Sequence, residues 1–120
     1  IKQMPELTLH VKFDFAASHF LTDYNGKCEH LHGHNYKLVI TVKGEKKNDG
    51  LVQDYTEIKK IVREHIIEKL DHKHLNNVVD NPSSEHLAIF IWEELKTHLP
   101  LLKKVALYET EQQFCEYEGE

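Results

Sequence analysis

Alternation of apolar and polar residues over two stretches, 7–15 and 36–42, constrains the fold of this chain more than any other feature. The first stretch has an apolar residue at every odd position, and the second has one at every even position. Successive side chains of a β-strand point to opposite faces of a sheet, so each stretch predicts a strand with one buried face. Polar residues at 23–27 predict a loop between the two strands.

Three histidines fall in phase with these predicted buried faces. The odd-numbered pattern of the first strand continues through Ala17 to His19 if no bulge intervenes. His32 and His34 share the even-numbered pattern of the second strand. Residues two apart on a strand point the same way, so these two imidazoles lie side by side and His19 can complete a set of three. Histidines hydrogen-bonded within the sheet are the alternative interpretation.

Three imidazoles with one open position are typical of a catalytic zinc site, whereas a structural zinc usually has four protein ligands. Imidazole nitrogen favours zinc over magnesium or calcium, which prefer oxygen, although iron and nickel also accept such ligands. We therefore predict a Zn²⁺ site formed by His19, His32 and His34.

Cys28 lies four residues before His32, in the predicted loop. A nearby cation lowers the pKa of a thiol, which would make a thiolate at Cys28 available as a base or a nucleophile. A fourth zinc ligand and an inert small side chain are the other two interpretations, and the spacing favours none of the three.

Two amphipathic helices are predicted in the middle of the chain. Residues Asp54–Glu57 have the spacing of a capping box ahead of an apolar stripe at positions 58–70. After an irregular segment, Ser83 or Ser84 can cap a second helix, whose apolar residues run from position 87 to 99.

Strands predicted at 105–109 and 114–117 complete the order ββααββ. This order predicts a single domain over residues 1–120 of the α+β class, in which two helices cover one face of a four-stranded antiparallel sheet. The edges of such a sheet expose unpaired backbone groups, which proteins commonly hide by pairing strands across subunits, so we expect a homo-oligomer.

Glu109 is a further candidate for chemistry, because it continues the inward parity of Val105 and Leu107. A buried carboxylate needs a partner. The guanidine-like edge of a ligand would pair with it through two hydrogen bonds, and so would Arg63, the single arginine of the chain.

Asp71 and His72 suit proton transfer, because a carboxylate can bias an imidazole through shared partners. The simpler interpretation is that this pair only occupies the C-terminus of a helix, where a cation is favourable. Ser83 and Ser84 likewise fit a helix start first and a ligand contact second.

Composition excludes several classes of function. The chain has 15 lysines and arginines against 20 acidic residues, a net charge of −5, and its basic residues form no stripe, so we expect no direct nucleic-acid partner. No apolar run approaches the roughly 20 residues that cross a bilayer, and the first residues do not have the pattern of a secretion signal. We therefore expect a cytoplasmic protein with no membrane partner and reduced thiols.

Taken together, the motifs of this chain resemble the 6-pyruvoyltetrahydropterin synthase superfamily. Besides His19 and Cys28, the resemblance rests on the segments 31–36 (LHGHNY), 50–54 (GLVQD), 70–76 (LDHKHLN), 81–85 (NPSSE) with Ile91 and Trp92, and 108–110 (YET). The short spacing from Cys28 to His32 looks like the bacterial 6-carboxy-5,6,7,8-tetrahydropterin synthases of queuosine biosynthesis, whereas the animal pyruvoyl enzymes carry a longer insert there.

The resemblance implies a tunnelling fold (T-fold), in which three subunits join their sheets into a barrel, two trimers stack as a hexamer, and the sites lie between subunits. It implies a pterin substrate, 7,8-dihydroneopterin triphosphate, which is converted to 6-carboxytetrahydropterin, acetaldehyde and triphosphate. In this family the three histidines would bind zinc and Cys28 would be the general base. Asp71 and His72 would complete its proton relay, and Glu109 would bind the amino-pyrimidine edge of the pterin. Ser83 and Ser84 would lie near the pterin.

Overall fold

The computed structural model describes residues 4–19 and 32–119, with His32 described through its backbone only. The elements follow in the order β1 (Glu6–His19), β2 (His32–Glu45), α1 (Tyr55–Val62), the π-helical turn η1 (Arg63–Ile67), α2 (Glu68–Leu70), β3 (Lys73–His74), the 3₁₀ turn η2 (Leu75–Asn77), α3 (Ser84–Lys96), β4 (Leu102–Tyr108) and β5 (Phe114–Tyr117). No helix among these elements is long and apolar enough to cross a membrane.

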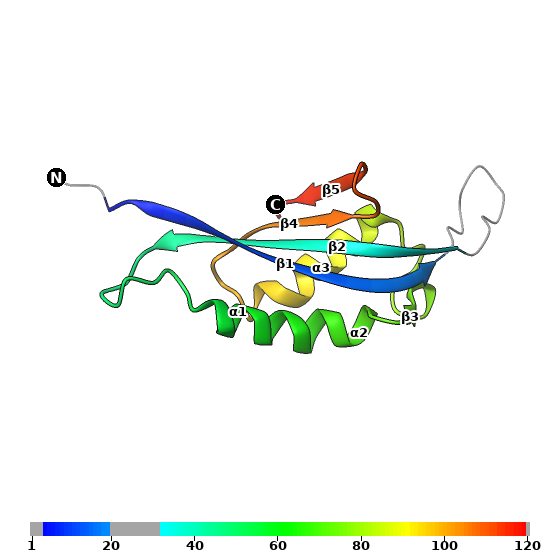
Figure 1. Ribbon diagram of the computed structural model, residues 1–120, viewed down its shortest axis with the longest axis horizontal. Helices are drawn as coiled ribbons and strands as arrows, with labels where there is room; N and C mark the ends of the chain where they lie inside the picture. Colours follow the sequence, from blue (N-terminus) through cyan, green and yellow to red (C-terminus); the bar gives the residue numbers. More distant parts are fainter. Residues whose placement is uncertain (1–3, 20–31, 120) are drawn as a thin grey trace.

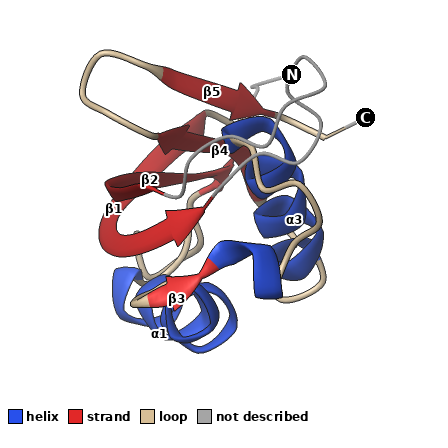
Figure 2. Cartoon of the chain, turned by 90° about the vertical axis from the view of Figure 1, so that its right-hand side faces the viewer, coloured by secondary structure: helices blue, strands red, loops and turns tan. Residues whose placement is uncertain are grey.

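One sheet contains all the described strands, in the spatial order β3-β1-β2-β4-β5. Strands β1 and β2 form a long antiparallel pair (Figure 1) whose register runs without a shift from Glu6 opposite Glu45 to His19 opposite His32. Strands β4 and β5 continue the antiparallel order on the far side of β2. Helices α1 and α3 lie on the same side of the sheet (Figure 2), so no helix of the described residues covers its other face.

The core lies between this sheet and the helices. Odd-numbered residues of β1 from Val11 onward and even-numbered residues of β2 from Tyr36 to Val42 are buried, as their alternation predicted. They pack against the apolar side of the helices, which includes Ile58 and Ile91. Such side chains contribute about 1.5–3 kcal/mol each when fully buried, so this layer is the main source of stability.

The predicted α+β class and the four antiparallel strands are confirmed. A fifth strand was not predicted: β3 lies parallel to β1, with Lys73 beside Ala17 and His74 beside Ser18. Two residues are too few to show an alternating pattern, so the sequence gives no sign of this strand.

The two predicted helices also differ in detail from the structure. The first is continuous from Tyr55 to Leu70, but a π-helical turn interrupts its α-helical pattern. The second ends at Lys96 with Thr97 as its C-cap, earlier than the apolar pattern up to Leu99 suggested. Leu99 is nonetheless fully buried, because the turn after the helix still packs on the core.

Side-chain caps fix where both helices begin. The Asp54 carboxylate accepts a hydrogen bond from the Thr56 N–H at 2.9 Å, and the Ser83 hydroxyl accepts one from the His86 N–H at 3.1 Å. Of the two serines that the sequence allowed, Ser83 is therefore the cap.

We expect Asp54→Ala to destabilise the protein by about 1 kcal/mol, because the first turn of α1 loses its acceptor. Asp54→Asn is the matched control, since its amide oxygen keeps that acceptor and it should stay close to wild type. Urea unfolding followed by circular dichroism measures both. Equal stability of the alanine and asparagine variants would contradict the capping role.

Candidate metal centre

His19 and His34 meet at one end of the sheet because of the β1–β2 register. His34 is paired with Ala17, two residues before His19, so both imidazoles lie on the helix-covered face. Their ring centroids are 5.2 Å apart in an edge-to-face arrangement. The expectation that an unbroken strand would carry the buried parity as far as His19 is confirmed, since His19 is only 2% exposed.

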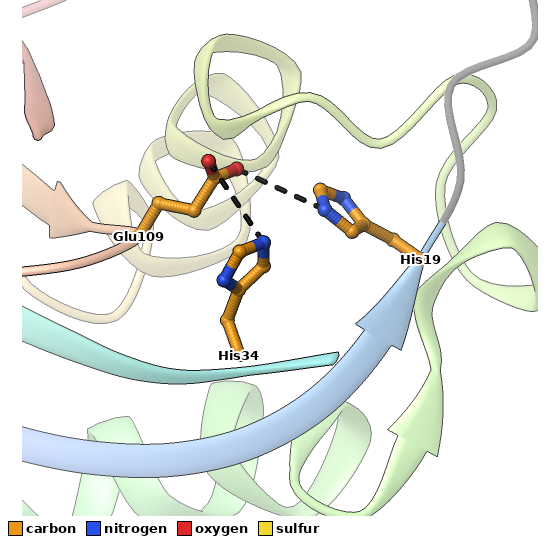
Figure 3. A group of neighbouring side chains, drawn as sticks. All are labelled: His19, His34 and Glu109. Carbon is orange, nitrogen blue, oxygen red and sulfur yellow. Dashed lines mark ion pairs between the residues drawn. The ribbon is translucent and has the colours of Figure 1, made fainter. Parts of the chain in front are cut away.

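Glu109, the residue after β4, closes this group. Its carboxylate oxygens lie 3.8 Å from His19 Nε2 and 3.9 Å from His34 Nε2 (Figure 3). The ligand atoms of the three residues lie within 4.8 Å of one another. Donors around a tetrahedral zinc with bonds of about 2.0–2.1 Å are about 3.4 Å apart, so small side-chain rotations would bring these atoms to coordinating distance.

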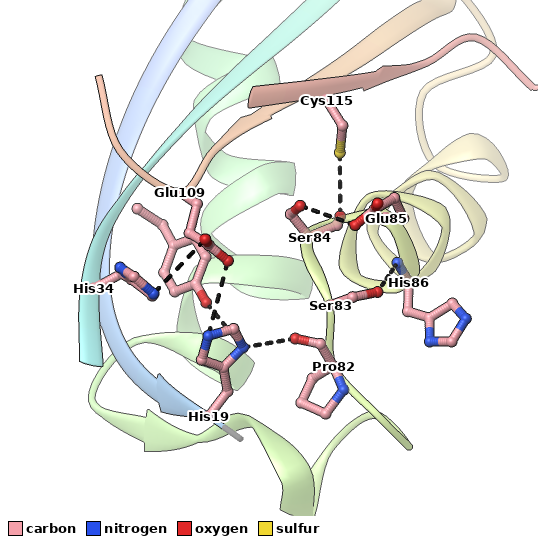
Figure 4. Close-up of polar contacts among 10 residues, drawn as sticks. His19, His34, Pro82, Ser83, Ser84, Glu85, His86, Glu109 and Cys115 are labelled. Carbon is pink, nitrogen blue, oxygen red and sulfur yellow. Dashed lines mark hydrogen bonds and ion pairs between the residues drawn. The ribbon is translucent and has the colours of Figure 1, made fainter. Parts of the chain in front are cut away.

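A hydrogen bond to the backbone fixes the tautomer of His19. Its Nδ1 lies 2.8 Å from the carbonyl oxygen of Pro82 (Figure 4), which can only accept, so Nδ1 carries the proton. Nε2 therefore presents its lone pair toward His34 and Glu109. Metal-binding histidines are commonly oriented by such a bond from the second ring nitrogen, so the donor set fits a zinc ion.

The Tyr36 ring packs edge-to-face against both imidazoles. Its side chain is fully buried, and its hydroxyl lies 3.4 Å from His19 Nδ1. The ring contacts His34 edge-on, with centroids 5.5 Å apart. Burial, together with the negative charge of Glu109, raises the pKa of the Tyr36 hydroxyl, so this group stays neutral at ordinary pH.

The start of α3 covers the other side of the group (Figure 4). The Ser83 hydroxyl caps the helix, and the Ser84 hydroxyl donates to the Glu85 carboxylate at 3.1 Å. The Cys115 thiol donates to the Ser84 carbonyl at 3.3 Å, and burial raises the pKa of this thiol. Both serine side chains thus have local structural partners, which is the simpler of the two interpretations that their sequence allowed.

Asp71 and His72 lie outside the His19–His34–Glu109 group. The Asp71 carboxylate accepts from the Ala16 N–H at 2.9 Å and lies 3.1 Å from His72 Nδ1. The bond from Ala16, followed by the charge of His72, lowers the pKa of Asp71, so the carboxylate is ionised and oriented. The His72 side chain is 82% exposed. The pair can therefore exchange a proton at the protein surface.

Two of the predicted site residues cannot be placed. Cys28 and the side chain of His32 lie outside the described residues, so the third imidazole and the thiol stay predictions. The sequence indicated that the Glu109 carboxylate pairs with a bound molecule. It did not indicate that this carboxylate lies beside both imidazoles. The alternation along β4 correctly pointed Glu109 inward, but only the register between β2 and β4 could place it next to His34. No sequence signal marks the Pro82 carbonyl.

The family model that matches this chain and the proteins that resemble it in sequence point to one family. The family model for 6-pyruvoyl tetrahydropterin synthase matches residues 8–120. A 6-pyruvoyl tetrahydrobiopterin synthase of Dictyostelium discoideum is 43% identical over 102 residues, covering 79% of this chain and 76% of the relative. The human protein of the same name is 38% identical over 131 residues, covering 91% and 89%.

A third relative, from Archaeoglobus fulgidus, has the name "Putative 6-carboxy-5,6,7,8-tetrahydropterin synthase". It is 32% identical over 111 residues, covering 92% of this chain and 95% of the relative. Among solved structures, the 6-pyruvoyl tetrahydropterin synthase of Caenorhabditis elegans superposes with a TM-score of 0.88 at 28% identity over the full length of both chains.

We expect His34→Ala to lose most of its bound zinc, because one of the two described imidazole donors is removed. Elemental analysis of purified protein and titration with Co²⁺, followed by its visible absorption, measure the loss. His98→Ala is the control, since His98 stacks on His65 away from the site and should leave the zinc content unchanged. Full zinc occupancy in His34→Ala would contradict the metal centre.

The Glu109→Gln variant tests whether the Glu109 carboxylate coordinates the zinc or only lies close to it. Because the sequence predicts three imidazole donors, this variant should keep its zinc. Loss of zinc in Glu109→Gln would instead make the carboxylate a ligand.

Proposed function

This chain belongs to the 6-pyruvoyl tetrahydropterin synthase family, and on that premise we propose that it is a zinc-dependent 6-carboxy-5,6,7,8-tetrahydropterin synthase of queuosine biosynthesis. The reaction takes 7,8-dihydroneopterin triphosphate and water to 6-carboxytetrahydropterin, acetaldehyde and triphosphate. The observation that carries the proposal is the convergence of His19 Nε2, His34 Nε2 and the Glu109 carboxylate at one end of the sheet.

His19 and His34, together with His32, would hold the zinc. A zinc ion held there would supply Lewis-acid chemistry: it would polarise the hydroxyl oxygens of the substrate's side chain and lower the cost of removing a proton from the adjacent carbon. The Pro82 carbonyl keeps His19 in the tautomer with its lone pair on Nε2, and the buried ring of Tyr36 limits the movement of both imidazoles.

Glu109 would orient the pterin. Its carboxylate is 26% exposed and so remains accessible to a ligand. Two adjacent N–H donors on the amino-pyrimidine edge match a carboxylate in geometry, and the charge strengthens both hydrogen bonds. Correct orientation of the reacting carbon beside the base accounts for a large part of the rate in such reactions. Ser83 and Ser84, at the start of α3, stay candidates for further contacts with the pterin.

Cys28 would remove the carbon-bound proton, and Asp71 with His72 would supply one elsewhere. The exposure of His72 supports a site built from two protomers, because this imidazole then serves a metal group on another copy. The sheet ends in a two-residue strand, β3, on one side and in β5 on the other, which leaves its edges available for pairing. With the subunit number that the family resemblance implies, we propose a trimer of joined sheets and a hexamer of two trimers.

A second candidate is 6-pyruvoyltetrahydropterin synthase, since relatives of that name reach 43% identity. The lengths of the alignments separate the human pyruvoyl enzyme from this chain but not the Dictyostelium one, whose 102 positions for 79% of the chain, about 95 residues, leave only about 7 without a counterpart here. The human alignment has 131 positions yet covers 91% of 120 residues, about 109, so about 22 positions have no counterpart here. The Archaeoglobus alignment has 111 positions for 92% of the chain, about 110 residues, and is nearly free of such gaps.

Incubation with 7,8-dihydroneopterin triphosphate should release acetaldehyde and triphosphate in equal amounts and yield 6-carboxytetrahydropterin. Mass spectrometry identifies the pterin, and a coupled alcohol dehydrogenase assay detects the aldehyde. Triphosphate release with a pyruvoyl pterin and no acetaldehyde would establish the second candidate instead.

Cys28→Ala is expected to keep its zinc and lose activity by a factor of about 10² or more, because the general base is removed. Parallel zinc analysis and turnover assays of this variant test that role. Loss of zinc would make Cys28 a ligand, and unchanged turnover would exclude it from the chemistry. Binding of a pterin by wild type without any turnover would identify a non-catalytic pterin- or zinc-binding module.

A further inference from the structure

A depression of about 390 Å³ lies beside the edge strand β3, where the sheet also carries the metal centre. It is lined by Ala16–Ser18 of β1, Gly33 and His34 of β2, and the consecutive residues His72, Lys73 and His74. The parallel pairing of β3 with β1 creates it, because Lys73 and His74 are placed beside Ala17 and Ser18.

The lining of this depression includes cationic and hydrogen-bonding groups but no carboxylate. Two other depressions on the described surface are mixed in charge. One is lined by two lysines together with Asp14 and Glu111, and the other by one lysine together with Glu6 and Glu45. On a chain with a net charge of −5, a depression without acidic groups is a distinctive place for an anion.

Lys73 is available to such an anion. Its side chain is exposed, and no carboxylate among residues 4–19 and 32–119 forms an ion pair with it. Lys37, by contrast, lies 3.8 Å from the Glu111 carboxylate. Beside Lys73, the His74 Nδ1 and the Ser18 hydroxyl are joined at 3.2 Å, which orients two further polar groups at the same depression.

We propose that this depression binds the phosphate oxygens of a polyphosphate-bearing substrate. This inference rests on the proposed function, in which the substrate is a pterin with a triphosphate tail. The tail carries several negative charges, so it needs cationic and hydrogen-bonding partners beside the site that holds the pterin. Lys73, with Ser18 and His74 beside it, offers such partners in the depression that His34 also lines.

The chain itself links this region to the chemistry. Lys73 follows His72 directly, and His72 is held by Asp71. Whichever copy of the metal centre receives a proton from His72 is therefore also approached by Lys73 and His74. The proposed phosphate subsite therefore lies next to Asp71 and His72, so a single substrate molecule can contact both the subsite and the proton relay.

Titration calorimetry of inorganic triphosphate into the full-length, zinc-loaded protein tests the subsite, with zinc content assayed before and after. Lys73→Ala should raise the Kd for triphosphate about tenfold, as expected for the loss of one charge-assisted hydrogen bond of about 1.5 kcal/mol, and Lys73→Arg should restore most of the affinity. The matched control is Lys12→Ala, an exposed lysine in the depression that also contains Asp14 and Glu111, which should stay within twofold of wild type.

Triphosphate that does not bind to wild type, or that binds equally well to Lys73→Ala, would overturn the subsite. An equal loss in Lys12→Ala would also overturn it, because the attraction would then be general to the sheet face. Binding of phosphate-free 7,8-dihydroneopterin tests the proposed function separately, since it should be the same in wild type and Lys73→Ala. Wild type that binds triphosphate but no pterin would refute the pterin enzyme and leave the anion site intact.

Discussion

The hydrogen bond from His19 Nδ1 to the Pro82 carbonyl is the constraint on which the metal centre depends. It joins the end of β1 to the residue before the cap of α3 across 63 positions of sequence. Both groups are buried, so breaking the bond would leave a donor and an acceptor unsatisfied at a cost of about 1–3 kcal/mol each. In the neutral ring the same bond determines which nitrogen carries the proton, so the packing of α3 on the sheet also orients the lone pair of Nε2.

The register of β1 and β2 provides the second condition. Fourteen consecutive residues of each strand pair without a bulge, and a slip by one position would move every side chain of a strand to the opposite face. Phe15 stacks on Tyr36 with centroids 4.9 Å apart, in the pair directly before the metal centre. Aromatic packing at this point therefore opposes a slip, and it keeps His19 and His34 on one face next to Tyr36.

Sequence reasoning succeeded where periodicity determines position. Alternation placed His19, His34 and Glu109 on inward faces, and the cap preceding α3 was limited to two serines. Two features were beyond its reach for physical reasons. A two-residue strand such as β3 has no period, and the distance between Glu109 and the imidazoles depends on tertiary packing between segments 75 or more residues apart in sequence.

The division of polar groups between two surfaces explains why assembly and catalysis would be linked in this fold. His19 is 2% exposed on the helix-covered side, whereas His72 is 82% exposed beside β3. A buried imidazole with a fixed lone pair suits metal binding, and an exposed imidazole oriented by an ionised carboxylate suits proton exchange with a group that arrives from outside. Leu7 follows the buried parity of β1 yet is 47% exposed, because the strand extends beyond the helices (Figure 1). The protomer thus has an exposed apolar residue near one end of β1 and the reactive groups at the other end, and the proposed assembly would have to bring a neighbouring copy to the latter to complete the site.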